Sequence, residues 1–174
     1  MLQPKLLKKV LAILEDSAIE YMVTGSIVSS IQGEPRTTHD IDILVNIADS
    51  SIQTIMSTFR PPDYYVSESA IKDAIQSKSM FNLIDTKDGD KIDFWILTDD
   101  DFDRSRFKRK FPEKILGLTM NISTSEDTIL MKLKWAKLSG GSEKQFTDAL
   151  RVYEVQFDNI NNNYIEFCGK ISKG

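Results

Sequence analysis

The sequence predicts an α/β protein of the α+β kind, in which a small mixed sheet is packed by helices and followed by a C-terminal helical part. Segments with apolar residues at every second position, typical of strands, are interspersed with segments whose apolar residues recur every three or four positions, typical of helices. Residues 124–174 show helical patterns throughout. With 174 residues the chain can form a sizeable core. We expect a core over residues 1–123 and a helical part over 124–174 packed on it.

The first elements follow from short-range patterns. Apolar residues at helical spacing, with lysines on the opposite face, predict a helix that leads into the first strand. The expected elements are a helix over 4–18, a strand over 21–24, a turn at Gly25-Ser26 that opens a small helix over 27–31, and a strand over 40–46 with the sequence DIDILVN.

The DIDILVN strand carries two carboxylates with one residue between them. Successive side chains of a strand point to opposite faces, so Asp40 and Asp42 share one face, and the intervening Ile41 faces the core. Two like charges held side by side raise each other's pKa, and a cation between them relieves this repulsion. Oxygen-only ligands suit a hard divalent ion such as Mg²⁺ or Mn²⁺.

The Gly25-Ser26 turn has the properties of a phosphate cradle. Glycine lets the backbone approach a ligand closely, and a helix N-terminus offers free N–H groups and partial positive charge. Ser26 adds a hydroxyl donor. Together with the carboxylate pair, this turn predicts a site for a metal-bound triphosphate.

The later elements follow from caps, turns and alternation. An Asp-Gly turn between two apolar runs predicts a hairpin, and Ser/Thr residues ahead of acidic ones predict helix starts. The expected elements are a helix from Ser50 to Arg60, a strand over 64–66, a helix over 67–76, hairpin strands over 80–86 and 91–97, one or two strands within 106–121, and helices after Thr124, after Ser142 and over 164–171.

Gly25-Ser26, a loop and Asp40-x-Asp42 in an apolar strand resemble the signature of the DNA polymerase beta type nucleotidyltransferase superfamily. The strings GEPRTTHDIDILV, EDTILMKLKWAKL and SEKQFTDALRVYEVQ are similar to small bacterial nucleotidyltransferases of the AbiEii-like group, which includes type IV toxin components. The resemblance covers residues 21–156. It implies metal-dependent transfer of a nucleoside monophosphate.

The resemblance also implies a third acidic residue, on a strand antiparallel and adjacent to the DIDILVN strand. Asp93 occupies the matching position, where it would bind metal with Asp40 and Asp42 and help to take the proton from the attacking hydroxyl. A lone carboxylate among apolar strand residues is costly to bury without a partner. The alternative is a strand-edge aspartate that faces water.

Five further side chains have open roles. Arg36-x-Thr38 matches a pattern near the site in the resembled group, and Arg36 either holds a phosphate or is solvated. Lys132 matches a helical lysine that contacts the nucleotide, with a solvated lysine as the alternative. Lys134 points about 200 degrees away from it on a helix, so at most one of the two is expected to face the site. Asp148 matches an acidic position, but a salt bridge explains it as well.

Charge and composition limit the possible compartments and partners. Residues 1–103 hold nine Lys/Arg and eighteen Asp/Glu, whereas residues 104–144 hold ten and four. The basic segment either faces a polyanion such as RNA or has its basic side chains alternating outward on a solvated strand.

His39, the single histidine, is expected to be an exposed side chain rather than a ligand. A single cysteine, Cys168, and the lack of a leader or an apolar span indicate a cytoplasmic protein that is not in a membrane.

The function expected from the sequence is transfer of a nucleotide from a nucleoside triphosphate, ATP included, to a hydroxyl. Asp40, Asp42 and Asp93 bind Mg²⁺ or Mn²⁺, and Gly25, Ser26, Arg36, Thr38 and Lys132 hold phosphates. The acceptor is open among an RNA end, a protein side chain and a small molecule, and the toxin resemblance implies an antitoxin partner. The alternative from another class is an inactive module of the same fold that binds a nucleotide or a partner protein.

Overall fold

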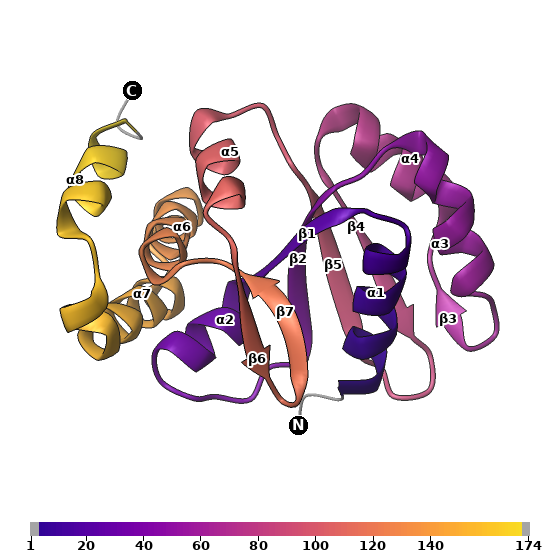
Figure 1. The fold of residues 1–174 in the computed structure, drawn as a ribbon, viewed down its shortest axis with the longest axis horizontal. Coiled ribbons are helices and arrows are strands. Elements are labelled where there is room, and N and C mark those ends of the chain that lie inside the picture. Colours follow the sequence, from indigo (N-terminus) through magenta and orange to yellow (C-terminus); the bar gives the residue numbers. More distant parts are fainter. Residues whose placement is uncertain (1–3, 172–174) are drawn as a thin grey trace.

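A computed structural model describes residues 4–171 and has one seven-stranded sheet at its centre (Figure 1). The strand order is β3-β4-β5-β2-β1-β7-β6. The strands are β1 (Glu20–Thr24), β2 (Asp40–Asn46), β3 (Tyr64–Tyr65), β4 (Met80–Asp85), β5 (Lys91–Ile96), β6 (Phe111–Ile115) and β7 (Leu118–Ile122). The helices are α1 (Pro4–Asp16), α2 (Gly25–Gln32), α3 (Ile52–Thr58), α4 (Glu68–Ser77), α5 (Asp101–Lys108), α6 (Ser125–Leu138), α7 (Glu143–Gln156) and α8 (Asn162–Ile171), with 3₁₀ turns at Asp49–Ser51 and Phe157–Asn159. The mixed sheet and its helices confirm the predicted fold class.

The middle of the sheet differs from the predicted pairing in one respect. The β4–β5 hairpin forms as expected, with antiparallel pairing of its arms. However, β5 pairs with β2 in parallel, so the expectation of an antiparallel neighbour was wrong. The cause is the placement of the hairpin: its second arm lies beside β2, and its first arm lies outside, so β5 runs in the direction of β2.

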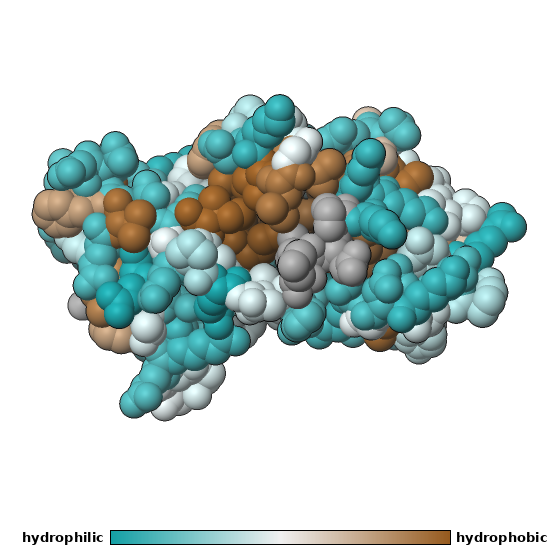
Figure 2. All heavy atoms as spheres, turned by 90° about the horizontal axis from the view of Figure 1, so that it is seen from below, coloured by the Kyte–Doolittle hydropathy of each residue, from teal (hydrophilic) through white to brown (hydrophobic). Residues whose placement is uncertain are grey.

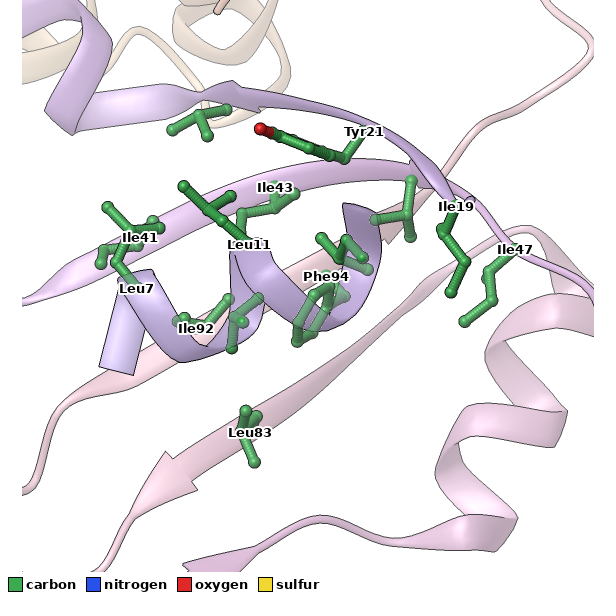
Figure 3. Close-up of a cluster of buried hydrophobic side chains, with 14 of the residues drawn as sticks. Leu7, Leu11, Ile19, Tyr21, Ile41, Ile43, Ile47, Leu83, Ile92 and Phe94 are labelled. Atoms are coloured by element: carbon green, nitrogen blue, oxygen red, sulfur yellow. The ribbon is translucent and has the colours of Figure 1, made fainter. Parts of the chain in front are cut away.

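The main core lies on the sheet face that carries the β-branched residues. Leu7 and Leu11 of α1 lie over Ile41 and Ile43 of β2, with side chains of β5 beside them (Figure 3). These residues have at most 4% of their surface exposed. The period-two pattern of DIDILVN therefore sends its isoleucines into this core, which leaves the opposite face of β2 for its aspartates.

The opposite sheet face has a smaller core and carries the C-terminal helices. Met22, Leu44 and Phe107 form a second buried cluster on this side, and a third cluster joins α6 and α7. In Figure 1, α6, α7 and α8 gather at one end of the molecule, away from α3 and α4. The helical part after residue 124 thus lies beside α2 and the acidic strand face rather than over the main core.

One interpretation of the basic segment after residue 103, that its side chains alternate outward on a solvated strand, was wrong. The other interpretation, that the segment faces a polyanion, stays a prediction. Residues 101–108 form α5 rather than a strand, capped by Asp100, whose side chain accepts from the Asp103 N–H. Acidic residues lie in the first turn and basic residues in the last, as the helix dipole favours. Most of the basic side chains are engaged in ion pairs, namely Arg104–Asp99, Arg106–Asp103, Arg109 with Glu126 and Asp127, and Lys110–Glu20.

The surface is uneven in polarity. Seen from below the view of Figure 1, it is hydrophilic at both ends and has an area of apolar side chains near its middle (Figure 2). Exposed large apolar residues also occur on α6 and at the β6–β7 turn, among them Leu138 and Leu116. Within residues 4–171, no helix has the length and apolar character needed to cross a membrane.

Candidate active site

The three predicted carboxylates lie on one face of two neighbouring strands. Asp42 of β2 pairs in register with Asp93 of β5, and Asp40 pairs with Lys91. Because the pairing is parallel and in register, side chains two residues apart on each strand form a square of three acids and one ammonium. The structure thus brings together Asp40, Asp42 and Asp93 as the sequence predicted.

Asp42 is half-buried and has a hydrogen-bond partner on the neighbouring strand. Its Oδ1 accepts a hydrogen bond from the Trp95 indole Nε1 at 3.0 Å. Burial raises the pKa of the Asp42 carboxyl, and the charges of Asp93 and Asp40 raise it further, although the Trp95 hydrogen bond and the nearby Lys132 act in the opposite direction. A cation beside Asp42 would favour its ionised form.

Asp93 and Asp40 share Lys91 as a counter-ion. The Lys91 Nζ lies 3.1 Å from the Asp93 Oδ2 and 3.9 Å from the Asp40 Oδ1. The hydrogen bond to Asp93 raises the pKa of Lys91. Only 13% of the Asp93 side chain is exposed, so the alternative of a water-facing aspartate does not hold. Its other oxygen, Oδ1, is buried and has no hydrogen-bond partner.

Gly25 joins the acidic face to the start of α2. Its φ of +74° lies in the left-handed region, and a Cβ at this position would lie 2.0 Å from the Asp42 Oδ2 and 2.7 Å from its Cγ. A side chain is therefore excluded by both conformation and space. The backbone at the N-terminus of α2 lies directly against the Asp42 carboxylate.

Ser26, Arg36, Lys132 and Asp148 form a second charged cluster next to the first. The Asp148 Oδ2 accepts from the Lys132 Nζ at 2.9 Å and from the Arg36 NH2 at 2.8 Å. Both cations also donate to the Ser26 Oγ, at 3.3 Å and 3.1 Å. Burial lowers the pKa of Lys132, and the hydrogen bond to Asp148 opposes this effect. Neither Arg36 nor Lys132 is a merely solvated side chain.

Thr38 and His39 lie outside both clusters. The Thr38 hydroxyl donates to the backbone oxygen of Asp40 at 3.1 Å, so it steadies the start of β2. Its expected contact with a phosphate stays a prediction. His39 is exposed, as expected.

Three observations indicate that the face formed by Asp40, Asp42 and Asp93 is suited to a divalent metal ion. Its donors are all carboxylate oxygens, the buried Asp93 Oδ1 has no partner, and burial together with the charges of its acidic neighbours raises the pKa of Asp42. In the part of the chain that the structure describes, no three acidic, His or Cys side chains already converge as a metal site. Asp40, with 64% of its side chain exposed, has room to turn toward the other two.

A cavity of about 510 Å³ opens beside Asp42 and runs between the sheet and α6. It begins at Gly25, Ser26 and Asp42 and is lined by both Lys132 and Lys134. The expectation that at most one of these lysines faces the site was therefore wrong, because the cavity extends around α6. Its size suits a small ligand.

Sequence reasoning missed Lys91 and Trp95 as members of this site. Both lie two residues from Asp93 on the same strand and so share its face. Period-two spacing was thus sufficient to place them beside the carboxylates. The contacts that Lys91 and Trp95 make with the three carboxylates could be known only from the register between β2 and β5.

Comparison with known proteins identifies the fold. No protein-family model matches the sequence. No curated protein matches it either. Among solved structures, the chain is similar to the antibiotic-resistance factor ANT(2'')-Ia, with 11% identity and a TM-score of 0.62 over 97% of this chain and 91% of that one.

Two further solved structures are also similar to this chain. The lincosamide antibiotic adenylyltransferase LnuA, bound to lincomycin, is 14% identical, with a TM-score of 0.57 over 88% of this chain and 98% of that one. An antigenic nucleotidyltransferase-like protein from Paracoccidioides brasiliensis is 17% identical, with a TM-score of 0.52 over 87% and 74%. At these identities the likeness establishes a nucleotidyltransferase-type fold.

Proposed function

We propose that the protein is a metal-dependent nucleotidyltransferase that moves a nucleoside monophosphate from a nucleoside triphosphate to a hydroxyl acceptor. The observation that carries this proposal is the parallel register of Asp42 with Asp93 directly against the N-terminus of α2. This register supports the proposal because the carboxylates lie beside the N-terminus of a helix. The similar structures support it, since two of them are adenylyltransferases or resistance factors of the same fold.

In this proposal the two clusters have separate tasks. Arg36, Lys132, Ser26 and the α2 N-terminus hold the β- and γ-phosphates and neutralise the departing pyrophosphate. The oxygen of the acceptor forms a bond to the α-phosphorus, and the bond from that phosphorus to the bridging oxygen of the β-phosphate breaks. Asp93, which also binds the metal ion in this proposal, helps to take the proton of the acceptor hydroxyl. A divalent ion held by Asp40, Asp42 and Asp93 would supply charge stabilisation at the α-phosphoryl oxygens.

The division of the chain follows from the same proposal. The core, residues 1–123, supplies the carboxylates and the phosphate cradle. The helical part, residues 124–174, supplies Lys132 and Asp148, which reach Ser26 and Arg36 of the core. Neither part holds the complete site. A cytoplasmic location, where nucleoside triphosphates are abundant, belongs to the proposal as well.

The test is transfer of label from the four α-labelled nucleoside triphosphates, with Mg²⁺ or Mn²⁺, to total RNA, soluble protein or a small-molecule extract. The Asp40→Asn/Asp42→Asn variant should lose the transfer, whereas Asp73→Asn, an exposed aspartate of α4, should retain it. Transfer that survives in the double variant contradicts the proposed site. Metal-dependent triphosphate binding without any transfer would instead indicate the inactive binding module.

A toxin role, with an antitoxin partner, rests on the sequence resemblance to the AbiEii-like group. Expression of the protein alone should then slow growth, and Asp42→Asn should relieve the effect. Unchanged growth on expression would contradict the toxin role and leave the transferase proposal intact.

A further inference from the structure

The cavity extends well beyond the carboxylates into a recess lined by aromatic and apolar side chains. We define this aromatic recess by Leu44, Lys78, Trp95, Met131 and Trp135, all of which line the cavity. The rings of Trp95 on β5 and Trp135 on α6 lie 5.5 Å apart between centroids, at 58° to each other. Two indoles from different elements therefore face one space next to Asp42.

We infer, on the basis of the proposed function, that the aromatic recess binds the acceptor, and that this acceptor is a small hydroxyl compound with an apolar ring and no positive charge. The inference combines three features of the described residues: the position of the recess relative to Ser26, the charges that line it, and the pairing of the basic segment nearby.

The position of the aromatic recess suits it to bind the acceptor rather than the triphosphate. An in-line displacement requires the attacking hydroxyl on the side of the α-phosphate opposite to the pyrophosphate. The pyrophosphate cradle at Ser26 follows β1, and the strand order is β4-β5-β2-β1. The far side of Asp42 from this cradle is therefore the side of β5 and β4, where Trp95 and Lys78 line the recess.

The charges of the recess exclude a polycation. Asp103 is fully engaged, with its oxygens bonded to Arg106 at 2.7 Å and to Thr98 at 2.8 and 2.9 Å. Asp100 caps α5, and Asp42 is the other carboxylate that lines the cavity, where the proposed function pairs it with a metal ion. Within residues 4–171, neither Lys78 nor Lys134 has a carboxylate within ion-pair distance, so with Asp42 bound to metal the recess presents two ammonium groups against Asp100. A multiply charged aminoglycoside would meet net repulsion there.

The pairing of the basic segment argues against an RNA acceptor. Of its five basic side chains between residues 104 and 110, Lys108 is the one that forms no ion pair within the described residues. A nucleic-acid site needs several cations free to contact phosphates. An enclosed recess with a tryptophan pair suits a small ring compound instead.

The experiment titrates wild-type protein, with saturating Mg²⁺ and free of nucleotide, with the anionic ring compound 8-anilino-1-naphthalenesulfonate and measures its fluorescence. Trp135→Ala should raise the dissociation constant about tenfold through loss of ring contact. Phe157→Ala, which removes an exposed aromatic residue outside the cavity, should change it less than twofold. Neutral 4-nitrobenzyl alcohol should displace the probe, and polycationic tobramycin should not.

Equal effects of the two alanine variants, or displacement by tobramycin as effective as by 4-nitrobenzyl alcohol, would overturn the inference. Transfer of α-label from ATP to tobramycin would also overturn it and leave the proposed function standing. Specific binding of the ring compounds, without label transfer to any acceptor, would instead contradict the proposed function and leave the recess as a ligand site.

Discussion

The two charged clusters of the site differ in sign and in how completely they are paired. The carboxylate cluster sets three acids against one ammonium and leaves a buried oxygen without a partner. The phosphate cluster sets two cations against one carboxylate, which accepts from both. Each cluster thus keeps an unmatched charge opposite to that of its proposed ligand. The carboxylate cluster comprises Asp40, Asp42, Asp93 and Lys91, and the phosphate cluster comprises Ser26, Arg36, Lys132 and Asp148.

This difference teaches that neither cluster is explained by folding stability alone. An enclosed acidic group with raised pKa and a buried lysine with lowered pKa both cost free energy in the folded state. Internal counter-ions reduce that cost but do not remove it. If the clusters serve opposite ligands, substitutions in one should leave the ligand of the other largely unaffected.

The largest expected effect comes from Asp42→Asn in the carboxylate cluster. Removal of the central metal-binding charge should lower the rate of nucleotide transfer at least about a thousandfold. The rate with saturating Mg²⁺ and triphosphate is the measurement. A loss of less than tenfold would mean that Asp42 is not at the reacting centre.

Gly25→Ala tests the close contact between the two clusters. Gly25 and Gly89 share a φ of +74°, but a Cβ at Gly89 meets nothing within 4 Å. Gly89→Ala should therefore cost about 1 kcal/mol from backbone conformation alone. Gly25→Ala should cost at least about 2 kcal/mol more, because the Cβ and Cγ of Asp42, and not only its terminal oxygens, lie in the way. Urea unfolding measures both, and equal losses would contradict the account.

Asp148→Asn tests the pairing inside the phosphate cluster. Lys132 has 6% of its side chain exposed and would lose its carboxylate partner, at a cost of about 3 kcal/mol in the free energy of unfolding. Asp63→Asn, which breaks the exposed pair with Lys87, should have no measurable effect. Similar behaviour of the two variants in urea unfolding would mean that Asp148 is not needed to hold Lys132.

Lys91→Met tests the internal counter-ion of the carboxylate cluster. With the ammonium removed, the three acids should bind Mn²⁺ about tenfold more tightly, because a competing positive charge about 3–4 Å away is lost. Electron paramagnetic resonance of free Mn²⁺ gives the dissociation constant without reference to activity. Lys72→Met, on the surface of α4, serves as the control. Weaker Mn²⁺ binding in Lys91→Met would show that the lysine supports the metal site rather than competes with it.

The smallest effect is a pH dependence of stability due to Asp42. Its carboxyl has a higher pKa in the folded than in the unfolded chain, so its contribution to stability is complete below about pH 4 and is lost as the pH rises through the folded pKa. In EDTA, Asp42→Asn should therefore be more stable than wild type at pH 7, and the difference should shrink toward pH 4. A difference that is constant with pH would contradict the raised pKa.

Local patterns were sufficient for much of the fold and for part of the site. The strand over 40–46 has the predicted bounds, because its period-two pattern matches a core on one face. The helix caps at Thr124 and Ser142 are also found, since each depends on residues only three positions apart. Asp40, Asp42, Gly25 and Ser26 are close in sequence, and the antiparallel pairing of β1 with β2, in which Thr24 lies opposite Asp42, brings them together.

The features that the sequence did not predict depend mainly on contacts between residues that are far apart in the chain. The parallel neighbours β2 and β5 are joined through several elements, so their direction is decided by where the β4–β5 hairpin docks. The contact of Lys132 with Asp148 bridges two helices, and its link to Ser26 spans 106 positions. In α5, alternating basic residues suggested a strand, but the acidic start and basic end of the segment fit a helix dipole better.

The most direct test of the central claim measures the two ligands separately in two variants. Binding of Mn²⁺ is followed by electron paramagnetic resonance, and binding of a fluorescent ATP analogue is followed in EDTA. Asp42→Asn should weaken Mn²⁺ binding at least about tenfold without weakening the binding of the analogue, and Lys132→Met should show the converse. If Asp42→Asn leaves Mn²⁺ binding unchanged, or if both variants lose both ligands equally, the division of the site into a carboxylate cluster and a phosphate cluster is wrong.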